Sequence, residues 1–105
     1  MINFYEETIR ELESNGKTEN DIKWIGNHDG YFDMTGITLK DIFDFEYDNG
    51  YGGAEIDQGL LIVGDDWWLE RQEYDGSEWW EFKTLPIKPD HAAKQINIFH
   101  KSWRW

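Results

Sequence analysis

Two runs of alternating hydrophobic and polar residues, separated by the Asp-Gly pair at positions 75–76, dominate the second half of the chain. Asp-Gly between two such runs is a strong β-hairpin signal, because glycine supplies the positive φ that a type I′ turn requires. The pattern predicts strands over 67–74 and 77–84. A two-residue turn fixes their register and places Leu69 opposite Phe82.

Alternation divides the side chains of this hairpin between two faces. The hydrophobic face is predicted to lie against the core and carries Trp67, Leu69, Trp80 and Phe82. The other face carries Trp68, Glu70, Gln72, Tyr74, Trp79, Glu81 and Lys83. Its register sets Glu70 directly across from Glu81, and like charges in that arrangement are unfavourable. The short apolar run 60–63, bounded by glycines, predicts a third strand that completes a meander over about 60–84.

The first half of the chain predicts both helix and strand. Helical spacing of hydrophobic residues, an Asn3 cap and a stop at Asn15-Gly16 predict a helix over about 3–14, with Ile2, Tyr5, Ile9 and Leu12 as its apolar stripe. Short strands are expected near 21–26 and 30–34, joined by a turn over 27–29.

A capping box at Thr38 and Asp41 predicts a second helix that continues to about Tyr47. The glycine-rich stretch 48–53 must end it. Beyond the meander, prolines at 86 and 89 break the pattern, and Asp90 is expected to cap a short helix over 91–99.

These elements predict an α+β fold. A small antiparallel sheet is expected, with the meander over about 60–84 extended by the strands near 21–26 and 30–34, and with two or three helices packed mainly on one face. Residues 1–105 are expected to form a single acidic domain with a basic, aromatic C-terminal segment over about 86–105.

Charge changes the picture of what this domain can bind. The net charge is −12; residues 1–82 hold 5 basic and 21 acidic residues, whereas residues 83–105 hold 5 and 1. Such a surface repels phosphate backbones, so no direct contact with nucleic acid is expected. The chain has no cysteine, no membrane-length apolar run and no signal-peptide pattern, which favours a cytoplasmic protein without a cofactor.

One acidic stretch overlays the oxygen-ligand positions of a twelve-residue calcium loop, through Asp44, Glu46, Asp48 and Glu55. Asn49 stands where that loop needs glycine, so we favour an acidic helix end over a metal site.

Seven tryptophans in 105 residues are the more informative anomaly. Alternation leaves Trp68 and Trp79 on the face of the sheet away from the core. Either a terminal helix covers that face, or it is an exposed aromatic patch with the composition of an interface hot spot.

Three strings, FEYDNGYGG at 45–53, DWWLER at 66–71 and EYDGSEWWEF at 73–82, resemble a family of short hypothetical proteins from phages and prophages of Gram-positive bacteria. The resemblance attaches no function to any residue. It implies a mobile-element protein, and small acidic proteins of that origin often bind and block a host defence nuclease, sometimes in place of DNA.

The resulting hypothesis is a non-enzymatic protein-binding module, an anti-CRISPR-like inhibitor that engages the basic, nucleic-acid-binding groove of a host nuclease. The residues predicted to bind are two aromatic anchors and a set of carboxylates: Trp68, Trp79, Asp65, Asp66, Glu70, Glu73, Asp75, Glu78 and Glu81. The alternatives are a small-ligand or carbohydrate-binding module that uses the tryptophan face, and a calcium-binding domain.

Overall fold

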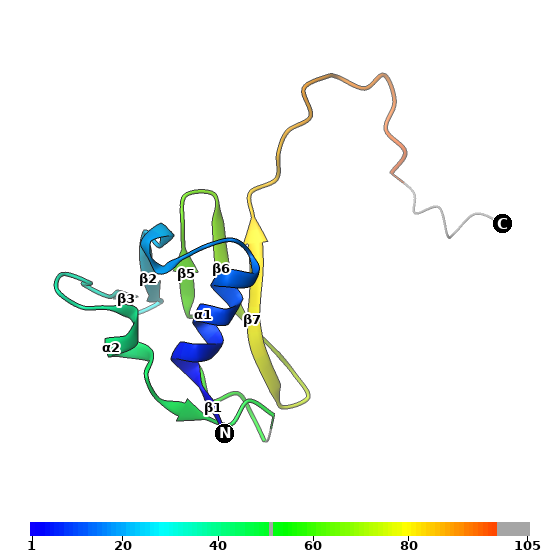
Figure 1. The fold of residues 1–105 in the computed structure, drawn as a ribbon. Helices are drawn as coiled ribbons and strands as arrows, with labels where there is room; N and C mark the ends of the chain where they lie inside the picture. Colours follow the sequence, from blue (N-terminus) through cyan, green and yellow to red (C-terminus); the bar gives the residue numbers. More distant parts are fainter. Residues whose placement is uncertain (51, 99–105) are drawn as a thin grey trace.

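The computed structural model describes residues 1–50 and 52–98. It has the predicted α+β fold, in which one antiparallel sheet carries a helix on one side (Figure 1). The elements of the described chain are β1 (Ile2–Asn3), α1 (Phe4–Ser14), the 3₁₀ helix η1 (Glu19–Asp21), β2 (Trp24–Asn27), β3 (Gly30–Tyr31), α2 (Leu39–Phe43), β4 (Glu46–Tyr47), β5 (Leu61–Val63), β6 (Trp67–Tyr74) and β7 (Ser77–Thr84). No helix in these ranges is long and apolar enough to cross a membrane.

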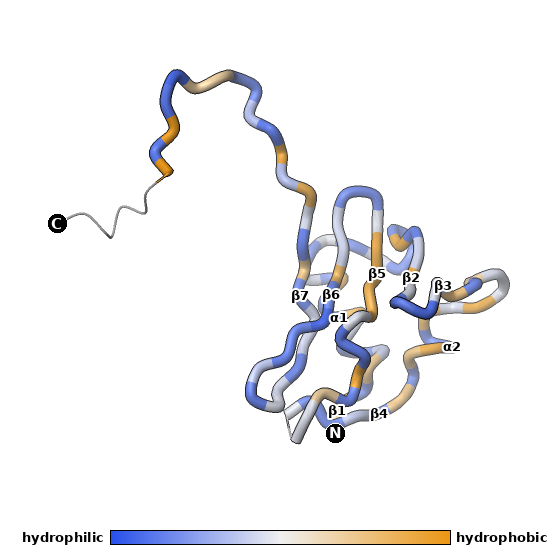
Figure 2. The backbone as a smooth tube through the Cα atoms, turned by 180° about the vertical axis from the view of Figure 1, so that it is seen from behind, coloured by the Kyte–Doolittle hydropathy of each residue, from blue (hydrophilic) through white to orange (hydrophobic). Residues whose placement is uncertain are grey.

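The larger sheet has the strand order β3-β2-β5-β6-β7, and each neighbouring pair is antiparallel. The predicted meander is therefore confirmed as β5, β6 and β7, and the predicted extension is confirmed as β2 and β3. A separate two-stranded sheet pairs β1 with β4. Hydrophobic residues follow β5 through the middle of the larger sheet (Figure 2).

The β6–β7 hairpin has the predicted register, with Leu69 opposite Phe82 and Tyr74 opposite Ser77. The turn residues Asp75 and Gly76 have φ values of 52° and 87°. Both values are positive, as a type I′ turn requires. Asparagine, aspartate and glycine tolerate this conformation best, which explains why an Asp-Gly pair specifies the turn.

Helix α1 begins as predicted, because the Asn3 side chain accepts a hydrogen bond from the Glu6 N–H at 2.9 Å. Its buried stripe differs from the predicted one. Phe4, Thr8 and Leu12 face the sheet, whereas Tyr5 and Ile9 are only half-buried. The Phe4 ring explains the rotation: it packs among aromatic rings, with centroids 4.6 Å from Phe43 and 5.5 Å from Trp80.

Helix α2 has the predicted capping box, in which the Asp41 N–H donates to Thr38 and the Asp41 carboxylate accepts from the Thr38 N–H. The prediction that it continues to Tyr47 is wrong, because it ends at Phe43. The Phe4 N–H donates to the Phe45 carbonyl at 2.9 Å, and Tyr47 pairs with Ile2. Strand pairing with a segment 41 to 45 residues away thus outweighs local helix propensity.

The predicted helix over 91–99 is also wrong for the residues that are described. Residues 91–98 form neither helix nor strand and are exposed, while the rest of the predicted helix and the aromatic tail lie outside the described residues. The Asp90 carboxylate contacts the His91 ring at 3.0 Å and does not cap a helix. Short helices are marginal without an apolar face to pack against, and this segment extends away from the sheet.

Candidate protein-binding surface

The larger sheet has an inner face, which contacts α1, and an outer face. Alternate residues of the central strands are buried on the inner face, including Ile25, Ile62 and Leu69. The side chains between them form the outer face, and all are half-buried or exposed: Trp24, Leu61, Val63, Trp68, Glu70, Gln72, Trp79, Glu81 and Lys83. Within the described residues, no helix lies over the outer face.

Trp68 and Trp79 belong to this outer face. Trp79 is 41% exposed and Trp68 is half-buried. Trp68 pairs with Lys83 and Trp79 pairs with Gln72, so the Glu70–Glu81 pair lies between the two tryptophans. Four residues along a strand separate these rungs, a distance of about 13 Å. The sequence left open whether a terminal helix covers these tryptophans. In the described residues no helix covers them.

Lys83 resolves the like-charge pair that the register predicts. Its Nζ lies 3.3 Å from Glu81 Oε1 and 3.4 Å from Glu70 Oε1. The hydrogen bond and charge of Glu81, followed by those of Glu70, raise the pKa of Lys83 above its usual range. One ammonium group therefore joins two carboxylates, and the centre of the outer face keeps one net negative charge.

The other predicted carboxylates do not gather around this centre. Asp65 and Asp66 precede β6, and Asp65 pairs with Lys23 at 3.6 Å. Glu73 and Asp75 lie at the hairpin end of the same strand. An eight-residue strand spans about 25 Å, so the structure places these exposed acids at opposite ends of the sheet.

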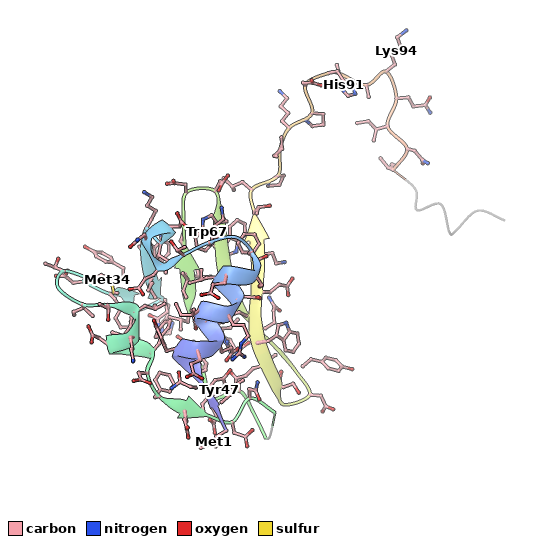
Figure 3. All side chains as sticks on the ribbon, viewed as in Figure 1. Met1, Met34, Tyr47, Trp67, His91 and Lys94 are labelled. Atoms are coloured by element: carbon pink, nitrogen blue, oxygen red, sulfur yellow. The ribbon has the colours of Figure 1, made fainter. Side chains whose placement is uncertain are left out.

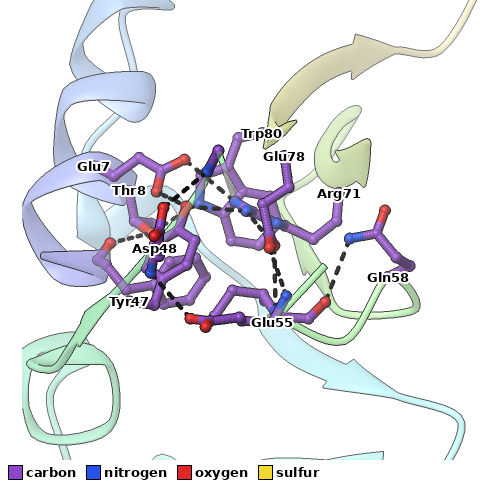
Figure 4. A network of polar contacts seen from close by, with 12 residues as sticks. Glu7, Thr8, Tyr47, Asp48, Glu55, Gln58, Arg71, Glu78 and Trp80 are labelled. Atoms are coloured by element: carbon purple, nitrogen blue, oxygen red, sulfur yellow. Dashed lines mark hydrogen bonds and ion pairs between the residues drawn. The ribbon is translucent and has the colours of Figure 1, made fainter. Parts of the chain in front are cut away.

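Glu78 does not belong to an exposed binding surface, and its prediction as a contact residue is wrong. It is 2% exposed and lies on the inner face. Its carboxylate accepts hydrogen bonds from Arg71 Nη2 at 3.0 Å and from the backbone N–H groups of Glu55 and Ile56 at 2.6 and 3.2 Å (Figure 4). The register itself carried this signal, because the alternation that buries Trp80 also buries Glu78.

Arg71 is the centre of the buried network in Figure 4. Its guanidinium group contacts Glu78, Glu7 Oε2 at 3.3 Å and the Tyr47 hydroxyl at 3.1 Å. The ring of Trp80 lies 4.9 Å from Arg71 Cζ. Tyr47 in turn donates a short hydrogen bond to Glu7. Because every partner is buried or nearly so, the network joins α1, β4, the 48–60 loop and the hairpin, and we assign it to the stability of the fold.

The four candidate calcium ligands are not brought together. The Asp44 carboxylate accepts from Asn3 at 2.9 Å, and Glu55 accepts from the Asp48 N–H at 2.9 Å. Glu46 is exposed on β4. In residues 1–50 and 52–98, no three His, Cys, Asp or Glu side chains are arranged to hold a metal ion.

Sequence reasoning missed a second feature of the outer face, a hollow beside β3. Trp24, Asn27, Gly30 and Tyr31 line it, and its volume is about 470 Å³. Gly26 pairs with Tyr31 across the strands, and it lies two residues after Trp24 on the same face of β2. A β-carbon at Gly26 would collide with the Gly30 carbonyl oxygen, so the close approach of the two strands requires glycine there.

Comparison with known proteins adds no relative: no family model, curated protein or solved structure matches the chain.

Proposed function

We propose that this protein is a non-enzymatic binding module whose outer sheet face engages a basic surface on a protein partner. The observation that carries the proposal is the uncovered pair Trp68 and Trp79, with the Glu70–Glu81 pair between them. Tryptophans are frequent hot-spot residues, because each contributes a large contact area at little cost in side-chain entropy. The carboxylates between them favour a partner that presents arginine or lysine.

The charge of the whole chain, −12, supports a partner with a basic groove. Long-range attraction between unlike charges accelerates encounter, and carboxylates can occupy positions where phosphates would otherwise bind. The resemblance to phage proteins directs the search to nucleic-acid-binding proteins of the bacterial host, among them defence nucleases. In this proposal the protein inhibits such a nuclease by covering its nucleic-acid groove.

The test is an affinity capture from host lysate at low and at high salt, followed by a nuclease assay of the captured protein. The test variants are Trp68→Ala/Trp79→Ala and Glu70→Gln/Glu81→Gln. The charge-matched control is Glu6→Gln/Glu13→Gln, because both residues are exposed on α1, away from the outer face. Ile37→Ala is the hydrophobic control, because Ile37 is 42% exposed and is not one of the residues that form the outer face.

We expect the immobilised protein to capture a nucleic-acid-binding protein at low salt and to release it at high salt. Both test variants should fail to capture it, whereas both controls should capture it. Capture that is equally strong with all folded variants would refute it. The alternative of a small-ligand or carbohydrate-binding module draws on the hollow between Trp24 and Tyr31. It predicts binding by ring stacking, with little dependence on salt.

A further inference from the structure

The segment that follows β7 exposes hydrophobic side chains. We name residues 85–98 the C-terminal arm; all of them are exposed, and the arm extends away from the sheet (Figure 3, where His91 and Lys94 mark it). Its hydrophobic side chains are exposed by 57% at Leu85, 92% at Ile87, 73% at Ile96 and 81% at Ile98. Exposed aliphatic side chains at this density are typical of a segment that binds another surface.

The start of the arm has restricted backbone freedom. In the sequence Leu85-Pro86-Ile87-Lys88-Pro89, each proline fixes its own φ, and the residue before it is biased toward extended conformations. Together these restrictions favour the polyproline II helix, which repeats every three residues with a rise of about 3.1 Å. Pro86 and Pro89 then lie on one side of the helix, about 9 Å apart, and Lys88 projects from another side.

The hollow beside β3 has the features that recognise such a segment. Polyproline II segments dock into grooves lined by aromatic rings, and Trp24 and Tyr31 are 41% and 77% exposed. Carboxylates lie next to the hollow: Asp29 is in the β2–β3 turn, and Asp57 accepts a hydrogen bond from Asn27 at 2.6 Å. These carboxylates can form ion pairs with the Lys88 ammonium group of a docked segment.

The arm cannot place both prolines in the hollow of its own chain. It begins at β7, and three strands separate β7 from β3 in the sheet. Four inter-strand spacings amount to about 19 Å, whereas the two residues from Thr84 to Pro86 span at most about 7 Å. The hollow of a second copy is free of this limit.

We propose that the protein forms a symmetric dimer in which residues 85–89 of each copy dock as a polyproline II segment between Trp24 and Tyr31 of the other. Lys88 pairs with the carboxylates of Asp29 and Asp57 across the interface. The contact is isologous, since each copy supplies one arm and one hollow, so it closes at two copies. This assembly does not depend on the partner proposed above, which binds around Trp68 and Trp79.

The test measures the self-association of the full chain by sedimentation over a concentration series. The arm variant is Pro86→Ala/Pro89→Ala, and the hollow variant is Tyr31→Ala. Tyr74→Ala is the matched control, because Tyr74 is 76% exposed at the far end of β6. Each test variant should raise the dimer dissociation constant by about tenfold or more, as expected for anchor residues, whereas the control should not change it. Tyr31 is 77% exposed, so its substitution should leave the fold intact.

A mixing experiment separates this geometry from other modes of association. The arm variant keeps an intact hollow, and the hollow variant keeps an intact arm. An equimolar mixture should therefore form heterodimers joined by one contact, at concentrations where each variant alone is monomeric. A wild-type chain that stays monomeric throughout, a dimer that both variants retain, or a mixture that does not associate would each overturn the proposal.

Discussion

Arg71 Nη2 lies 3.0 Å from Glu78 Oε1, and neither side chain is exposed to solvent. The two residues lie two rungs apart on the β6–β7 hairpin, on the face that also buries Trp80. An ion pair of this kind is expensive to desolvate, and it is retained only when further hydrogen bonds satisfy both partners. Here Glu7 and Tyr47 accept hydrogen bonds from the two terminal nitrogens of Arg71, and the backbone N–H groups of Glu55 and Ile56 donate to Glu78. Among the described residues, only Arg71 Nε is buried without a hydrogen-bond partner.

Removal of one partner of this pair should destabilise the fold strongly. Glu78→Ala leaves the Arg71 charge and two backbone donors buried without their acceptor, so we expect a loss of about 3–5 kcal/mol in the free energy of unfolding. Urea unfolding followed by tryptophan fluorescence measures it. Glu13→Ala, at an exposed position of α1, should stay within about 0.5 kcal/mol of the parent. Equal effects of the two substitutions would contradict the assigned role of Glu78.

Two adjacent tryptophans should respond very differently to truncation. Trp80 is 3% exposed, and its Nε1 donates to Thr8 Oγ1 at 2.8 Å, whereas Trp79 is 41% exposed. Trp80→Ala creates a core cavity and should cost about 3–5 kcal/mol. Trp79→Ala should cost about 1 kcal/mol or less. The melting temperatures of both variants measure these losses. A Trp79→Ala variant as unstable as Trp80→Ala would show that the outer face is not a free surface.

The sequence predicted best those elements that local chemistry determines. The Asp-Gly turn at 75–76 fixed the hairpin register, and Asn3 and Thr38 marked the starts of both α-helices. Each signal depends on residues within a few positions of one another, so no knowledge of the tertiary structure is needed.

The failures have one physical origin, which is contact between segments distant in sequence. The residues after Phe43 leave the helix because they pair with β1. The buried network around Arg71 was missed because its partners Glu7 and Tyr47 lie on other elements. The hollow at Trp24 and Tyr31 exists because Gly26 lets two strands approach closely. Tertiary context overrides local propensity in each case.

The turn glycine at position 76 should not tolerate a side chain. Its φ is 87°, and a β-carbon there would lie 2.6 Å from the Gly52 carbonyl oxygen. Gly76→Ala therefore combines left-handed backbone strain with a steric collision, and we expect a loss of at least about 1–2 kcal/mol. Chemical unfolding measures the loss. Ser77→Ala, at the neighbouring exposed position, is the control, and a Gly76→Ala variant as stable as this control would contradict the turn geometry.

Lys83 should stabilise the hairpin by screening Glu70 from Glu81. The substitution Lys83→Met keeps most of the side-chain length but leaves two carboxylates facing each other across the strands. We expect a lower melting temperature at low salt and a smaller difference at high salt, because salt screens exposed charges. The double variant Lys83→Met/Glu81→Gln should recover part of the loss. A salt-independent effect would instead indicate lost packing by the lysine stem.

Tyr47 should make the protein sensitive to alkali. Burial, followed by the hydrogen bond to Glu7, raises the pKa of the Tyr47 hydroxyl above its ordinary value near 10. Above pH 10 the unfolded chain therefore releases this proton more readily than the folded chain, so the free energy of unfolding falls as the pH rises through that range. Below about pH 10 the hydroxyl is protonated in both states and has no such effect.

The substitution Tyr47→Phe should flatten the decrease in stability above pH 10, whatever it does to stability at neutral pH. Urea unfolding at a series of pH values from neutral to alkaline measures the slope for both proteins. The raised pKa of Lys83 acts in the same direction and in the same range, but it is present in both proteins, so the difference between their slopes isolates Tyr47. Identical slopes would mean that Tyr47 ionises equally in the folded and unfolded states, and would refute its place in the buried network.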